Sequence, residues 1–361
     1  MKARLTTPSK ESLLLGTLLC LLAGCATQSK TAKTEFFYPP PPNEPRLQFL
    51  TSFSSEKELR GGEDKNLMSY LTGVKPSEKS LGKPYGGATH DKKIYLCDTA
   101  LGAVLVVDLQ ARRIGVLDSQ GEGALRLPLN IAVDEDGACY VADTGREQVV
   151  IFDKNGVYSG VIGKPGEMKP RDVALTAERI YVADLQKRSV HVLDKATRNL
   201  LFEIPRPEDR TNQTRALFTP TNLALDSKGQ IYVADTGGYH VQVYDSDGKY
   251  VRSVGEMGDG QGQFARVKGI AVDRNSRLYA VDAMSKVVQI FDEKGDLLTW
   301  FGEPGAGGVM NNLPAKVLVD YDDVDFFKSY VAPNFKVEHL VLVLNQLGPH
   351  RVSIYGFGQK K

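Results

Sequence analysis

The side chains best suited to chemistry stand at one recurring position, two residues after a proline in successive copies of a repeated unit. That position holds Asn130, Asp172 and Asn222. Amide and carboxylate oxygens are the ligands that Ca²⁺ prefers, so these residues are candidate ligands for Ca²⁺ or another divalent metal. Lys316 stands at the same position of the last unit, where its ammonium would repel a cation. The full candidate ligand-binding set is Asn130, Arg171, Asp172, Asn222, Lys268 and Lys316.

Other catalytic signatures are missing from the sequence. The five histidines show no metalloprotease or haem-attachment spacing, and no nucleophile elbow or phosphate loop occurs. Cys97 and Cys139 lie in neighbouring units, and their offsets within those units place them on opposite strand faces. We therefore expect two buried free thiols rather than a disulfide.

One five-residue phrase with tyrosine second and aspartate last is written five times along the chain. Its final residues are Asp98, Asp143, Asp184, Asp235 and Asp282. An aspartate in every copy indicates a structural role, because its carboxylate accepts hydrogen bonds from the backbone N–H groups of a tight turn.

Each copy belongs to a longer unit of about 41 to 51 residues. A unit reads as four short runs of β-branched and aromatic residues separated by turn residues, for example 222–225, 231–235, 241–244 and 250–254. Four antiparallel strands in a unit of this length are typical of a propeller blade. The fold class predicted is therefore an all-β, six-bladed β-propeller, the sixth blade being incomplete.

The sixth unit lacks a fourth strand. Pro314 opens it, and residues 340–344 and 352–355 form its second and third strands. We expect residues 46–53, at the other end of the domain, to supply the missing strand. This pairing would close the ring and remove two exposed sheet edges.

The repeat resembles a known family. The order Pro-x-Gly/Asn-Ile/Val-Ala, Tyr-Val-Ala-Asp and Val-x-Val-Phe/Tyr-Asp is similar to the NHL repeat, over about residues 46–357. Gly258–Phe264 resembles the linker between NHL blades. The whole layout is similar to a set of bacterial six-bladed NHL lipoproteins, which implies a location but little chemistry. Six-bladed lactonases of the senescence-marker type imply a channel metal held by Asn and acidic ligands, an alternative interpretation of Asn130, Asp172 and Asn222.

The first 24 residues have the features of a secretory signal. Three basic residues precede Leu13–Leu22, an apolar run too short to span a bilayer. Residues 22–25, Leu-Ala-Gly-Cys, resemble the bacterial lipobox, in which Cys25 is acylated and becomes the new N-terminus. We expect a signal peptide over 1–24, a lipidated and proline-rich tether over 25–45, and the propeller over 46–361. Ala26 implies, by the same resemblance, the outer rather than the inner membrane.

The sixth unit also carries an insert, roughly residues 320–336. It is rich in acidic residues and in aromatic ones, namely Phe326, Phe327, Tyr330 and Phe335. These side chains must either be buried as a clamp on the propeller or be presented to a partner. The second alternative would give an aromatic partner surface with an acidic rim.

Charge and composition argue against one class of partner. The chain of 361 residues has 45 Lys and Arg against 44 Asp and Glu, which gives no electrostatic basis for a nucleic acid partner. We expect a membrane-anchored, non-enzymatic scaffold whose loops bind another envelope protein or a polymer, without a cofactor. The alternatives are a metal-dependent hydrolase or lyase at the channel mouth and a sugar- or peptide-binding sensor.

Overall fold

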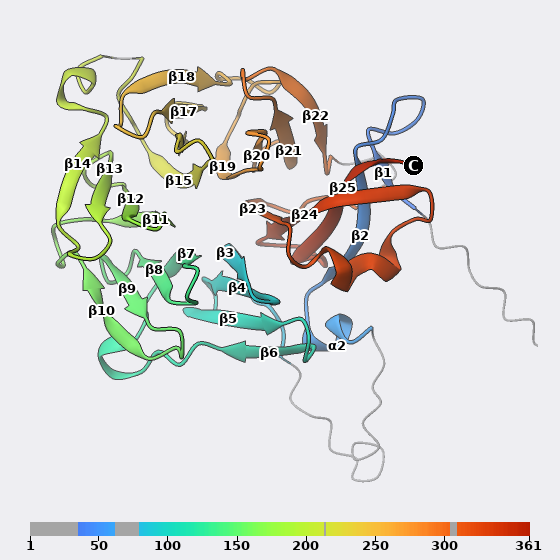
Figure 1. Cartoon of the computed structure of the whole chain (residues 1–361), viewed down its shortest axis with the longest axis horizontal. Helices are drawn as coiled ribbons and strands as arrows, with labels where there is room; N and C mark the ends of the chain where they lie inside the picture. Colours follow the sequence, from blue (N-terminus) through green and yellow to red (C-terminus); the bar gives the residue numbers. More distant parts are fainter. Residues whose placement is uncertain (1–34, 62–78, 213, 304–308) are drawn as a thin grey trace, which may run out of the picture. The chain divides into compact units, whose positions relative to one another are not determined.

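The computed structural model describes residues 35–61, 79–212, 214–303 and 309–361. Within these ranges, six antiparallel sheets follow one another around a ring (Figure 1). The innermost strand of each sheet contacts the innermost strands of its two neighbours, and that of the last sheet contacts that of the first. Residues 36–361 are therefore a closed six-bladed β-propeller, as the repeat predicts.

The first five blades have four strands each, numbered in chain order from the centre of the ring outwards. Blade 1 contains β3 (Pro84–His90), β4 (Lys93–Asp98), β5 (Ala103–Asp108) and β6 (Arg113–Val116). Blade 2 contains β7 (Pro128–Val133), β8 (Cys139–Asp143), β9 (Gln148–Phe152) and β10 (Tyr158–Ile162). Blade 3 contains β11 (Pro170–Leu175), β12 (Arg179–Asp184), β13 (Ser189–Asp194) and β14 (Leu200–Ile204).

The next two blades continue this order. Blade 4 contains β15 (Pro220–Leu225), β16 (Ile231–Asp235), β17 (His240–Tyr244) and β18 (Tyr250–Val254). Blade 5 contains β19 (Val267–Val272), β20 (Leu278–Asp282), β21 (Val287–Phe291) and β22 (Leu297–Phe301). The short helices are α2 (Glu56–Leu59), η1 (Gly121–Gly123), η2 (Pro207–Asp209) and η3 (Val324–Tyr330). None of the helices in the described ranges is long and apolar enough to span a membrane.

Blade 6 joins the two ends of the described chain. From the centre outwards it contains β23 (Pro314–Asp320), β24 (Phe335–Asn345), β25 (Val352–Lys360), β2 (Leu47–Phe53) and β1 (Phe37–Tyr38). The antiparallel pairing of β2 with β25 confirms the predicted closure of the ring. The fifth strand, β1, was not predicted, and it lies within residues 25–45, the expected tether. The expected signal peptide and Cys25 lie outside the described residues.

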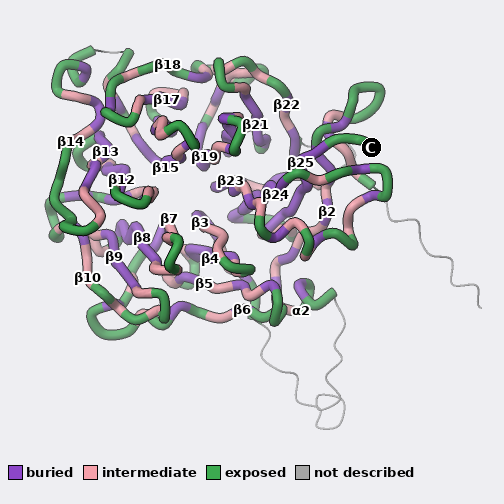
Figure 2. The backbone as a smooth tube through the Cα atoms, viewed as in Figure 1, coloured by how far each residue is buried: buried purple, intermediate pink, exposed green. Residues whose placement is uncertain are grey.

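The hydrophobic core lies between neighbouring blades. The second strand of a blade is buried along its whole length, as in β8 and β16, because both of its faces pack on other blades. The fourth strand alternates between exposed and covered residues, as in β18, because one of its faces meets solvent. Burial therefore decreases from the inner strands to the outer ones and the loops (Figure 2). This scaffold holds the ends of the innermost strands at the centre of the ring.

Candidate functional site

The innermost strands all begin with the same irregularity. In five blades the strand register shifts between the proline and the residue two positions later, and in blade 5 between Val267 and Ile270. Such a β-bulge adds one residue to the strand and redirects its side chain. In four of the six blades the residue at this position has a side chain, namely Asn130, Asp172, Asn222 and Lys316, and these side chains lie at the centre of the ring.

Asp172 and Lys316 form an ion pair between opposite blades. They belong to blades 3 and 6, and Nζ of Lys316 lies 2.9 Å from Oδ2 of Asp172. Both side chains are buried, with exposed fractions of 8% for Lys316 and 2% for Asp172. The same oxygen accepts hydrogen bonds from Nδ2 of Asn222 (3.1 Å) and from the backbone N–H of Leu223 (2.9 Å). Oδ1 accepts from the backbone N–H of Val173 (2.8 Å). One carboxylate therefore connects blades 3, 4 and 6.

A second set of contacts forms around the hydroxyl of Tyr85 in blade 1. Nζ of Lys268 and Nη2 of Arg171 each lie 3.4 Å from this oxygen. The Lys268 ammonium also lies 4.7 Å from the centre of the Tyr85 ring, a cation–π contact. Neither Lys268 nor Arg171 forms an ion pair with any residue that the structure describes. The three residues come from alternate blades, so side chains span the centre of the ring here too.

These contacts show whether the predicted metal ligands could bind a divalent cation. Asp172 and Asn222 are in contact, whereas Nδ2 of Asn130 donates to the backbone oxygen of Arg171 (2.9 Å). Asp172 supplies the one carboxylate of the three candidates, and the Lys316 ammonium already lies against it. This donor set does not fit a divalent cation, which needs several oxygen ligands and repels an ammonium. The described residues also contain no group of three or more His, Cys, Asp or Glu placed to hold a metal.

Glycine replaces the polar residue in the two remaining blades because neighbouring blades approach too closely there. A Cβ on Gly86 would lie 2.0 Å from Oδ1 of Asn130, and one on Gly269 would lie 2.3 Å from Cα of Lys316. Any side chain at these positions would collide with the next blade. Close packing between blades therefore explains why two of the six positions hold glycine instead of a polar residue.

The repeated aspartates have the structural role that the sequence predicts. All five are completely buried. Asp282 accepts hydrogen bonds from the backbone N–H groups of Ala265, Arg266, Met284 and Ser285, at 2.8–3.2 Å. Asp98 and Asp143 accept from the equivalent linkers and turns of their own blades. Each carboxylate therefore fastens the linker that enters a blade to the turn after the second strand.

The two cysteines are free and buried, which confirms the prediction for them. Burial raises the pKa of the Cys97 thiol well above its usual value, and the nearby Asp172 and Asp143 carboxylates raise it further. Burial raises the pKa of Cys139 to about 12. Both thiols are therefore held in the protonated, unreactive form.

The aromatic insert buries two of its four predicted aromatic side chains, as the clamp alternative expects. Phe327 and Phe335 are 2% and 1% exposed and lie in the core, while Phe326 and Tyr330 are half-buried. Gln48 of β2 donates to the backbone oxygen of Tyr330 and accepts from the N–H of Ala332. The insert is a clamp over blade 6, because its β24 strand begins at Phe335 and η3 packs on the same core.

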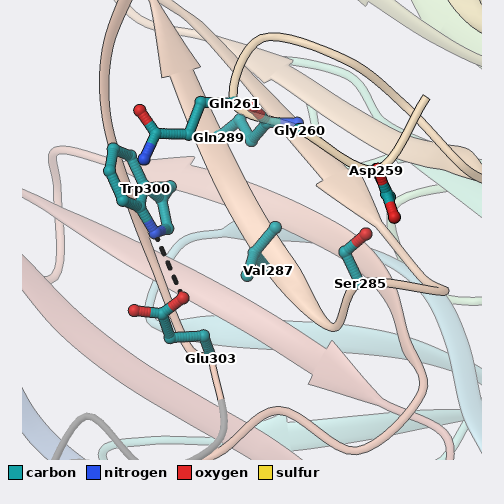
Figure 3. A pocket seen from close by; sticks show the side chains of 8 residues that line it. All are labelled: Asp259, Gly260, Gln261, Ser285, Val287, Gln289, Trp300 and Glu303. Carbon is teal, nitrogen blue, oxygen red and sulfur yellow. Dashed lines mark hydrogen bonds between the residues drawn. The ribbon is translucent and has the colours of Figure 1, made fainter. Parts of the chain in front are cut away.

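A pocket beside blade 5 was missed at the sequence level. It has a volume of about 160 Å³ and is lined by Asp259, Gly260, Gln261, Ser285, Val287, Gln289, Trp300 and Glu303. In Figure 3, Trp300 and Glu303 stand on one side, Asp259 and Ser285 on the other, and Val287 between them. Trp300 is half-buried, and Asp259 and Glu303 are exposed. We call this feature the Trp300 pocket.

Three segments build the Trp300 pocket: the linker before β19, β21 with the turn before it, and the end of β22 with the residues after it. The one signal in the sequence was indirect. The Gly258–Phe264 linker was recognised, but Trp300 occurs once and therefore has no counterpart in other blades to mark it. A comparison of the repeated units therefore does not reveal a functional residue that occurs in one unit only.

Comparison with known proteins supports the fold. A family model described as a 6-bladed β-propeller, DUF5128, matches residues 211–301. No curated protein matches the sequence. Among solved structures, a gluconolactonase from Xanthomonas campestris has a TM-score of 0.55 at 15% identity and covers 91% of this chain and 99% of its own. A streptogramin B lyase has a TM-score of 0.52 at 13% identity, covering 77% and 84%.

A nidogen/laminin complex also contains a similar chain, with a TM-score of 0.50 at 17% identity, covering 62% of this chain and 83% of its own. At such identities the likeness extends to the propeller fold alone. Two of these neighbours are named as enzymes and the third as a protein complex, so the fold does not decide between catalysis and binding.

Proposed function

We propose that the protein is a lipid-anchored propeller of the bacterial cell envelope that binds another envelope protein and catalyses no reaction. The proposal combines the lipobox-like sequence ending at Cys25 with the sites that the propeller offers. Acylation of Cys25 would attach the chain to a membrane, and Ala26 favours the outer one. At most about 40 Å of extended chain then joins Cys25 to Phe36, where the propeller begins.

The Trp300 pocket is the observation that carries the binding function. Tryptophan is among the residues that contribute most to protein interfaces, and here its half-buried ring stands beside two exposed carboxylates. An aromatic ring with an acidic rim, the kind of partner surface expected for the insert, is thus proposed for this pocket. At the ring centre, in contrast, the Asp172 carboxylate is already engaged by Lys316 and Asn222.

The anchor can be tested by metabolic labelling with a palmitate analogue. We expect the wild-type protein to be labelled and to fractionate with the outer membrane, and the Cys25→Ser variant to lose both properties. A labelled Cys25→Ser protein, or an unlabelled wild type, would contradict the anchor.

The binding function can be tested with a photo-reactive amino acid at position 261 in living cells, because Gln261 is exposed at the Trp300 pocket. We expect one discrete adduct that disappears when Trp300→Ala is added. The matched control places the same probe at Glu135, an exposed turn residue of blade 2, and should give no such adduct. Identical adducts from both positions, or none from position 261, would argue against the proposal.

A further inference from the structure

We infer that the Trp300 pocket binds a lysine or arginine side chain of a partner protein. This inference rests on the proposed binding function and specifies the chemistry of the partner. Three features support it: the negative charge of the pocket, the indole ring of Trp300, and the hydrogen bonds that hold the linker before β19 in place.

The charge of the pocket is negative. Asp259 and Glu303 line it, and no lysine or arginine is among its described lining residues. Both carboxylates are exposed, so they can pair with a cation that enters between them. A neutral ligand could donate hydrogen bonds to these carboxylates but would form no ion pair with them.

The aromatic wall adds to this preference. Nε1 of Trp300 lies 3.4 Å from Oε2 of Glu303, so the carboxylate stands at the edge of the indole (Figure 3). Among the described residues, no lysine or arginine forms a cation–π contact with this ring. An ammonium or guanidinium over the face of tryptophan makes the strongest of the cation–π contacts, and a carboxylate beside the ring strengthens the attraction.

The frame of the pocket is preformed. Gln289 donates from Nε2 to the backbone oxygen of Gln263 (2.7 Å) and accepts at Oε1 from the N–H of Gly262 (2.8 Å). Gln263 in turn accepts from the N–H of Gly260 and donates to Glu256. The linker is therefore held before any ligand arrives, which lowers the entropic cost of binding.

The size and surroundings of the pocket favour one side chain on a protein rather than a free small cation. A volume of about 160 Å³ is small, and Val287 provides an apolar surface for the methylene stem of a long side chain. Met284 directly precedes the lining residue Ser285, and Met257 lies two residues before Asp259; they are 62% and 71% exposed. Methionines adapt to varied apolar surfaces and are common at such interfaces.

The test uses Trp300 itself, because it is the only tryptophan of the chain. Its fluorescence is followed in the mature lipidated protein in detergent during titration with the methylamides of Nα-acetyl-lysine and Nα-acetyl-arginine. Nα-acetyl-norleucine methylamide, which lacks the charge, is the neutral control, and N-acetylglucosamine tests for a sugar site. We expect a saturable change with the two cationic probes alone, weakened by added salt.

Variants assign the response to the pocket. Glu303→Gln and Asp259→Asn should each weaken the binding of the cationic probes about threefold to tenfold. Glu135→Gln removes the same charge from an exposed turn elsewhere and should leave binding unchanged. Equal responses to lysine and norleucine probes, a response to the sugar alone, or no saturable response would overturn the inference.

The inference and the proposed function can fail separately. An adduct at position 261 in cells without any response to the cationic probes would leave the binding function standing and remove the cation. A response to the probes without an adduct would show a cation pocket that no envelope protein occupies.

Discussion

The ammonium of Lys316 lies 2.9 Å from the carboxylate of Asp172, although the two residues are 144 positions apart and belong to opposite blades. The contact spans the centre of the ring, and Lys268 and Arg171 meet Tyr85 there as well. Residues whose types suggested an open ligand site therefore hold the blades together. The pocket that we propose as a binding surface, the Trp300 pocket, lies elsewhere, beside blade 5.

Removing one partner of the central ion pair should destabilise the fold strongly. Asp172→Asn or Lys316→Met leaves a buried charge unpaired, and we expect each to lower the free energy of unfolding by about 3–5 kcal/mol. The double variant should recover much of that loss. Urea unfolding of the four proteins checks this, and additive losses in the double variant would show that the two charges do not interact.

Loss of a repeated aspartate should also be costly. Asp282→Ala leaves four backbone N–H groups without their acceptor, and we expect a loss of about 3 kcal/mol in the free energy of unfolding. Asp292→Ala, in the exposed turn that closes the same blade, removes two such bonds and should cost much less. Thermal unfolding compares the two variants. Equal losses would mean that the buried position has no special structural role.

Two adjacent residues of the aromatic clamp, one buried and one exposed, should differ in their effect on stability. Phe327→Ala should lower the free energy of unfolding by about 3–5 kcal/mol, because it opens a cavity between η3 and blade 6. Lys328→Ala changes an exposed residue next to it and should have almost no effect. Denaturant unfolding measures both. If Phe327→Ala were harmless to stability, the insert would not be a clamp.

The insert should also make stability depend on pH. Burial, and then the neighbouring Asp320 carboxylate with which it shares a hydrogen bond, raise the pKa of Asp323 from 3.8 to about 7. Between about pH 4 and 7 the folded protein keeps a proton that the unfolded chain has released, so this contribution to stability falls as the pH rises and is lost above pH 7.

The side chain of the Asp323→Asn variant stays neutral at every pH. The variant should therefore lose this contribution to the pH dependence of the free energy of unfolding. We expect the variant to unfold about 2–4 °C higher than the wild type at pH 8, which corresponds to roughly 1 kcal/mol, and to differ less at pH 5. Thermal unfolding at the two pH values checks the sign. A variant that is less stable than the wild type at pH 8 would contradict it.

The repeat made most of the fold predictable. The strands of blade 4 lie where the sequence places them, and the closing strand predicted at 46–53 is found at Leu47–Phe53. Hydrogen-bonding patterns that recur in every blade, such as that of Asp282, could be inferred because five copies give the same signal.

The contacts at the centre of the ring could not be predicted in the same way. Asp172 binds an ammonium rather than a metal because the long side chain of Lys316 extends to it from the opposite blade. The spacing of residues in the sequence does not predict how far a side chain extends across the ring. The burial of Phe327 depends on the shape of a segment that occurs once. The Trp300 pocket was missed for the same reason, since its walls come from three segments with no repeated pattern.

The pairing of Leu47 with Phe357 has a consequence for how the protein matures. The chain is made from its N-terminus, so β2 must wait for the last strand before blade 6 can form. A chain that ends before β25 cannot form this pairing, so β2 and the last strand that is present keep unpaired edges, which favour aggregation. Blade 6 can therefore be completed only by a chain that contains both β2 and β25.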